Sequence, residues 1–159
     1  GGVIQLKGTV TDAVTAAIPV QFIAALVGTS FFAVLFGVPR KFYFAAGVVG
    51  VLGWMVYILM SRYTPMGDFG STFLAATMVA FLSRYAAIKL KCPSTVFLIC
   101  GIFPLIPGAG VFWSAYYIAS TQLESAIMMG LSSVKLTLAI VLGIIVAANV
   151  FHSSNWQSK

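Results

Sequence analysis

The chain has 159 residues, of which 60% are hydrophobic and only 8% are charged, and its mean hydropathy is +1.04. A soluble domain is about 45–50% apolar and about 25% charged, so a soluble fold of this size could not bury this much apolar surface. Nine Lys and Arg outnumber three acids, but they lie between apolar runs and form no basic face with exposed aromatics, which argues against nucleic-acid binding.

Five apolar segments are long enough to cross a membrane as helices, since about 30 Å of hydrocarbon requires roughly 20 residues. The sequence therefore predicts an all-α integral membrane protein with a single transmembrane domain over residues 1–159. The predicted spans cover about residues 13–36, 42–60, 69–90, 94–119 and 131–151. The first residues lack the basic region and cleavage site of a secretory signal, so we expect none there.

Short connections separate the predicted spans, and their charges predict an orientation. The connections after the first and third spans, with the adjoining helix ends, carry Arg40, Lys41, Arg84, Lys89 and Lys91. In the other two connections, Arg62 is the one basic residue. Basic residues concentrate on the cytoplasmic side, which predicts an outside N-terminus and a cytoplasmic C-terminus. Before the fifth span, Thr121 to Glu124 fits a capping box, with Thr121 at the N-cap.

Polar side chains inside the spans lie on stripes of small residues, where helices pack closely. Gln21, Thr72 and Lys135 are each followed at helical spacing by Ala or Gly. Gln21 forms either a helix–helix hydrogen bond or a ligand contact. Arg84 and Lys135 lie near span ends, where they either extend to the headgroups or hold an anionic substrate group.

The fourth predicted span is interrupted near its middle. Residues 101–110 read GIFPLIPGAG, with two prolines and three glycines. Proline removes a helical hydrogen bond, and in a membrane the freed groups need protein or water. Transporters place such broken helices at substrate sites. A structural kink without function is the alternative.

The sequence gives no support for an enzyme, a metal site or a cofactor. Cys92 and Cys100 are eight residues apart and expected to be reduced, and His152 is the single histidine. No nucleophile–base pair is visible. The three acids, Asp12, Asp68 and Glu124, lie at or outside the span ends. Ion coupling would therefore use another group or a partner chain.

Several motifs together resemble the threonine/serine exporter family, and more closely its short membrane subunit. They are Ala16 to Pro19, Val38 to Arg40, Ser71 to Phe73, Ser83-Arg84, Pro93 to Phe97, Gly101 to Gly108, and Tyr116. The resemblance covers nearly the whole chain. It implies five transmembrane helices in a bacterial inner membrane and a larger partner subunit of related topology. It also implies export of small polar metabolites, either threonine and serine or a dicarboxylate such as succinate.

The sequence thus predicts a membrane subunit of a secondary exporter that works as a homo- or hetero-oligomer in the lipid bilayer. The expected substrate pathway comprises Gln21, Ser71, Thr72, Arg84, Thr95, Pro104, Pro107, Gly108, Gly110, Tyr116 and Lys135. The alternative is a non-transporting scaffold that stabilises a partner transporter.

Overall fold

A computed structural model describes residues 18–155 of the chain, and within that range the chain consists of helices joined by short turns. The predicted all-α class is therefore confirmed, and the described residues contain no strand. In chain order the elements are α2 (Ile18–Leu35), η1 (Arg40–Phe42), α3 (Tyr43–Tyr63), α4 (Gly67–Leu90), α5 (Ser94–Ile102), η2 (Phe103–Leu105), α6 (Gly108–Ala119) and α7 (Leu123–Asn155).

Three helical segments are long and apolar enough to cross a membrane: Arg40–Tyr63, Gly67–Leu90 and Leu123–Val150. The pair Ser94–Leu105 and Gly108–Ala119 makes a fourth if it is one span, with a bend of 52° between its halves. α2 is apolar but shorter, and the predicted first span begins at residue 13, outside the described residues. The chain is a multi-pass α-helical membrane protein, and the count of five spans stays a prediction.

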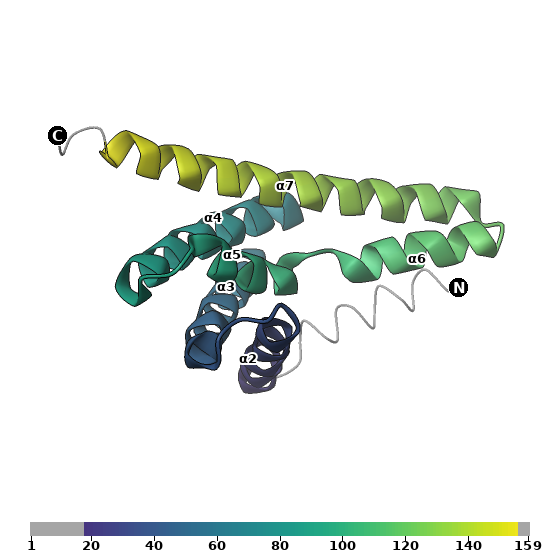
Figure 1. The fold of residues 1–159 in the computed structure, drawn as a ribbon. Helices are drawn as coiled ribbons and strands as arrows, with labels where there is room; N and C mark the ends of the chain where they lie inside the picture. The colour runs from purple at the N-terminus through teal and green to yellow at the C-terminus, as the bar shows by residue number, and fades with distance from the viewer. Residues whose placement is uncertain (1–17, 156–159) are drawn as a thin grey trace.

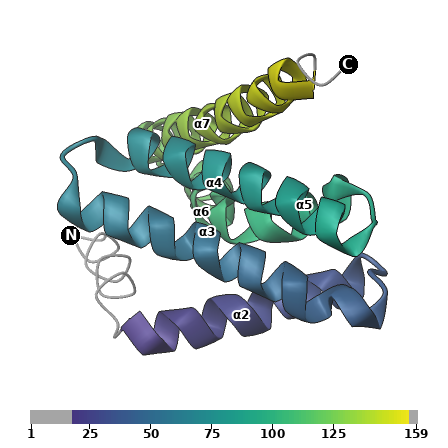
Figure 2. The same cartoon turned by 90° about the vertical axis from the view of Figure 1, so that its left-hand side faces the viewer.

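Close helix contacts at glycine build the bundle of α2, α3, α4 and α5. α3 lies between α2 and α4, as Figure 2 shows. Gly50 packs against the Thr29 side chain of α2, and Gly53 packs against Val79 of α4. A Cβ at Gly101 of α5 would lie 2.8 Å from both Val49 and Val79. Side chains at these positions would force the helices apart, so small residues set the spacing.

The α2–α3 and α4–α5 connections lie at the same end of the bundle. Val38 and Phe42 from the first share a buried cluster with Ala87, Phe97 and, at its edge, Cys92. Figure 2 shows both connections on the right. The first turn uses Gly37 in the left-handed conformation, at φ 66°. The basic residues of the two connections therefore gather at one end of the bundle, and the orientation of that end stays a prediction.

α6 and the first half of α7 form an antiparallel hairpin that projects from this bundle, to the right in Figure 1. The Ser133 side chain packs on Gly110, and the Ser114 hydroxyl donates a hydrogen bond to the Ala126 carbonyl oxygen at 2.9 Å. Farther along, α7 packs on α4, where a Cβ at Gly143 would lie 2.8 Å from the Phe73 carbonyl oxygen. α7 therefore links the hairpin to the bundle.

The predicted capping box before α7 is wrong. Thr121 has φ 59° in the turn after α6, and its hydroxyl donates to the Ser120 carbonyl oxygen at 2.7 Å. The first helical bond of α7 runs from the Ala126 N–H to the Gln122 carbonyl oxygen. The tight reversal of the chain thus takes Thr121 out of the capping position, and the helix begins one residue later than the sequence predicts.

Candidate functional site

The site begins at the break between α5 and α6, which confirms the predicted interruption of the fourth apolar segment. α5 ends at Ile102, and η2 carries Pro104 in its first turn. Ile106 is extended with ψ 127°, and Pro107 with ψ 54° precedes the first residue of α6, Gly108. Because neither proline has an N–H, the α-helical ladder cannot continue through them.

The two sides of the break differ in burial. On the bundle side, the Phe103 ring stacks on Phe32 of α2, with ring centroids 3.4 Å apart. Leu105 is buried in a cluster that α3, α4, α5 and α7 share. On the other side, Ile106 and Gly108 are exposed. The non-helical backbone is therefore covered by the bundle on one side and uncovered on the other.

A polar and aromatic cluster lies between α2 and α3 near this break. Gln21 is only 8% exposed, and its Oε1 accepts a hydrogen bond from Trp54 Nε1 at 3.2 Å. Trp54 stacks on Tyr57 at 5.3 Å, and both rings pack against the cluster that contains Leu105. Apart from Pro104, Pro107 and Gly108, which form the break itself, Gln21 is the predicted pathway residue that contacts among the described residues connect to the break.

Trp54 and Tyr57 are not among the residues that the sequence predicts for the site, so their place in this cluster is new from the structure. The available signal was spacing, since Trp54 and Tyr57 are three residues apart and share one face of α3. The cluster thus joins α2 to α3 through the Trp54–Gln21 hydrogen bond.

The Trp54–Gln21 hydrogen bond should contribute measurably to stability. Trp54→Phe removes the N–H donor but keeps a ring beside Tyr57, so we expect a loss of about 0.6–2 kcal/mol in free energy of unfolding. Unfolding in detergent measures this loss. The double variant with Gln21→Leu should lose less than the two single variants together, because they share one interaction. Trp113→Phe on α6 is the control, and strictly additive losses at positions 21 and 54 would contradict the coupling.

Ser71 and Thr72 lie buried in the first turns of α4, with their hydroxyls directed to their own helix. Ser71 donates to the Gly67 carbonyl oxygen at 3.0 Å, and Thr72 donates to the Asp68 carbonyl oxygen at 2.7 Å. Serine and threonine often satisfy themselves in this way within helices. Both side chains are buried, so in this structure neither hydroxyl is presented to a solute.

The remaining predicted residues are spread along the chain. Arg84 is half-buried in the second half of α4, and Thr95 is exposed in the first turn of α5. Tyr116 is 52% exposed on α6, and Lys135 is exposed on α7. Gly110 packs on Ser133 within the hairpin. The described structure does not bring these residues together with the Gln21 cluster.

Three further hydroxyls were not predicted as site residues. Those of Thr29, Ser83 and Tyr117 are buried without a hydrogen-bond partner among the described residues. Thr29 and Ser83 lie in the bundle, and Tyr117 lies in the hairpin. Burying such a group unpaired costs about 1–3 kcal/mol. Of these three residues, only Ser83 was singled out in the sequence, as part of the Ser83-Arg84 motif.

The described residues contain no group of three or more His, Cys, Asp or Glu side chains arranged to hold a metal ion. What the fold and the break define is a multi-pass helical membrane protein with an interrupted helix packed into its bundle. Residues 21–150 match the family model described as threonine/serine exporter, and the chain belongs to that family.

A curated relative, the threonine/serine exporter of Corynebacterium glutamicum, is 28% identical to this chain over 94 residues. The matched region is 59% of this chain and 18% of the relative, so the chain spans a small part of that protein. No solved structure matches the chain.

Proposed function

We propose that the chain is a membrane subunit of a secondary exporter for small polar metabolites, either threonine and serine or a dicarboxylate such as succinate. Membership of the threonine/serine exporter family supports this proposal. The relative's name supports the amino-acid substrates, and the dicarboxylate rests on the resemblance alone.

The observation that carries the proposal is the half-covered break. Non-helical backbone at membrane depth is tolerated where protein buries it or where it lines a water-filled cavity. Ile106 and Gly108 are exposed, while Leu105 on the other side is buried. If α5 and α6 form one span, the break lies near its middle, which is where transporters place substrate sites. We therefore assign the exposed side of the break to the substrate route.

The chemistry around the break suits a small polar solute with a carboxylate. The first turn of α6 begins at Gly108 without a side-chain cap, and helix N-termini attract negative charge. The Gln21 amide and the Tyr57 phenol provide neutral hydrogen-bonding groups on the bundle side. Arg84, farther along α4 toward the basic end, would draw carboxylates to the entrance.

A larger partner subunit of the same family would complete the route on its open side. α6 packs mainly on α7, and its other faces carry exposed apolar residues such as Val111, Phe112 and Ile118. A membrane partner seated there would cover the exposed backbone at Gly108. This chain would then supply one wall of the route and the partner the other.

We further propose that the chain lies in the bacterial inner membrane with the basic end of the bundle in the cytoplasm. In a Cys92→Ser background, a cysteine replacing Gln122 should react with an impermeant maleimide in intact spheroplasts. A cysteine replacing Lys91 should react only after permeabilisation. Both positions are exposed, which makes them a matched pair. The reverse labelling pattern would overturn this orientation.

Export from cells tests the proposed function. A strain that lacks its own threonine exporters is loaded with a threonine dipeptide or with succinate, and the external metabolite is measured over time. We expect export when this chain and the larger subunit are produced together, and background export when either is missing. If the larger subunit exports alone and this chain only raises its abundance, the chain is a scaffold and the proposal fails.

A further inference from the structure

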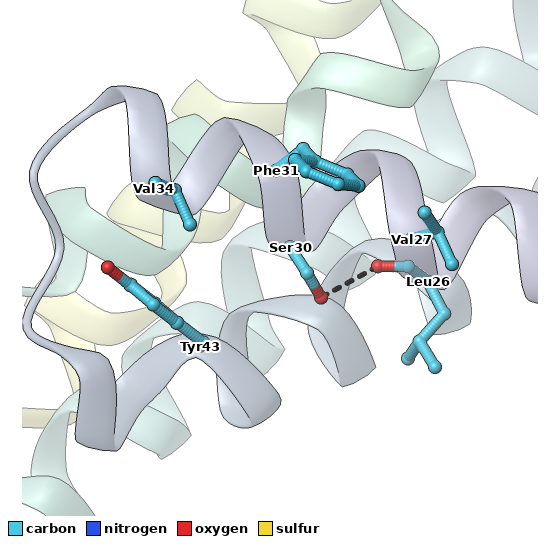
Figure 3. Close-up of a pocket in the computed structure, with 6 residues that line it drawn as sticks. All are labelled: Leu26, Val27, Ser30, Phe31, Val34 and Tyr43. Atoms are coloured by element: carbon cyan, nitrogen blue, oxygen red, sulfur yellow. Dashed lines mark hydrogen bonds between the residues drawn. The ribbon is translucent and has the colours of Figure 1, made fainter.

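An apolar groove lies between α2 and the start of α3, and Figure 3 shows the residues that line it. It has a volume of about 250 Å³ and is lined by Leu26, Val27, Ser30, Phe31, Val34 and Tyr43. Val27, Phe31 and Val34 are about half exposed or more, so the groove opens on the surface of the bundle. It is separate from the break and its polar cluster.

The lining of the groove favours a hydrocarbon chain. The lining contains two hydroxyls, the phenol of Tyr43 at the start of α3 and the hydroxyl of Ser30, which donates to the Leu26 carbonyl oxygen at 2.8 Å, a bond that Figure 3 marks. The Ser30 donor is already used within α2, and the other α2 residues in the lining are apolar. Along α2, a polar ligand would lose hydration without gaining partners, whereas an acyl chain would not.

One end of the groove leads to positive charge. Tyr43, which lines the groove, is the first residue of α3 and directly follows η1, which carries Arg40 and Lys41. Both cations are exposed, and Lys41 Nζ lies 4.8 Å from the centroid of the Phe42 ring. The α2–α3 and α4–α5 connections contain no acid. Basic groups beside membrane helices attract anionic lipid headgroups.

We propose that this groove binds one anionic phospholipid, with an acyl chain along α2 and the phosphate at Arg40 and Lys41. We favour a lipid over a protein helix because the apolar groove is open at the surface and two exposed cations, Arg40 and Lys41, precede Tyr43 at its α3 end. The site goes beyond the proposed export function and does not depend on it. In this arrangement the lipid also fixes the end of the α2–α3 hairpin against the headgroup layer.

Native mass spectrometry of the full chain in detergent, titrated with phosphatidylglycerol, tests the proposal. The wild type should retain one phosphatidylglycerol under conditions that remove phosphatidylcholine with the same acyl chains. Arg40→Gln/Lys41→Gln should weaken retention about tenfold or more, because two basic contacts to the headgroup are lost. Val34→Trp should weaken it comparably by filling the groove.

Two matched controls make the result specific. Lys89→Gln/Lys91→Gln removes the same charge at the same end of the bundle, and Leu138→Trp adds the same ring to an exposed site on α7. Neither control should change retention. If both double lysine or arginine variants lose phosphatidylglycerol retention equally, the effect reflects general surface charge and the proposed site is wrong. If inorganic phosphate displaces the bound phosphatidylglycerol and Val34→Trp does not change its retention, the lipid contacts the protein through its headgroup only. If the wild type forms a homodimer that Val34→Trp abolishes, a second copy of the chain occupies the groove. Either result would overturn the proposal.

Discussion

Replacing Pro104 and Pro107 together by Ala should reduce export at least tenfold while leaving membrane insertion intact. Alanine restores the two backbone N–H groups and favours helix, by about 3 kcal/mol per site relative to proline. The segment from Ile102 to Gly108 would then tend to straighten, which removes the irregular backbone that we assign to the route. Initial rates of threonine export, normalised to the amount of protein in the membrane, measure the effect.

Pro65→Ala is the matched control for this double variant. Pro65 is exposed in the α3–α4 turn, far along the chain from the break, so its replacement should leave export unchanged. Wild-type export rates in the double proline variant would contradict a role for the break in transport.

The second large effect concerns stability at the meeting point of α3, α4 and α5. Gly101→Val should lower the free energy of unfolding by about 3 kcal/mol or more, because the side chain would overlap Val49 and Val79 in a packed interior. Two buried neighbours on separate helices would have to move to make room for it. Thermal unfolding of the purified chain in detergent measures the loss.

Gly28→Val on α2 is the control for that substitution. A Cβ at Gly28 meets nothing within 4 Å, so the added side chain lies in open space. We expect a change within about 1 kcal/mol, since valine is at least as good a helix former as glycine. A loss at Gly101 no larger than that at Gly28 would contradict the view that glycine contacts set the helix spacing.

Much of the fold follows from residue patterns that act locally. Apolar length predicts the helices, and the prolines at 104 and 107 predict the break, because both depend on backbone hydrogen bonding within one segment. The sequence also predicts that the stripe of small residues on α4 is a packing face, and Thr72, Ala76 and Ala80 are indeed all buried. Lys135 does not fit its stripe, because at its level α7 packs on α6 through Ser133 and leaves the lysine exposed.

The site was harder to predict because it depends on which helix faces meet. Gln21 was identified as a polar residue in an apolar span, but its partner Trp54 is thirty-three residues away in the sequence. No local pattern pairs the two. The position of Arg84 relative to the break likewise depends on tertiary packing, and residues such as Thr95 and Tyr116 were chosen by motif rather than by contact.

Efflux from proteoliposomes loaded with labelled threonine or labelled succinate tests whether this chain and the larger subunit form an exporter together. The vesicles contain this chain, the larger subunit, or both. We expect efflux only when both are present, and the label that leaves faster identifies the substrate class. Absence of efflux of either label from vesicles in which both subunits are folded and correctly oriented would contradict this expectation.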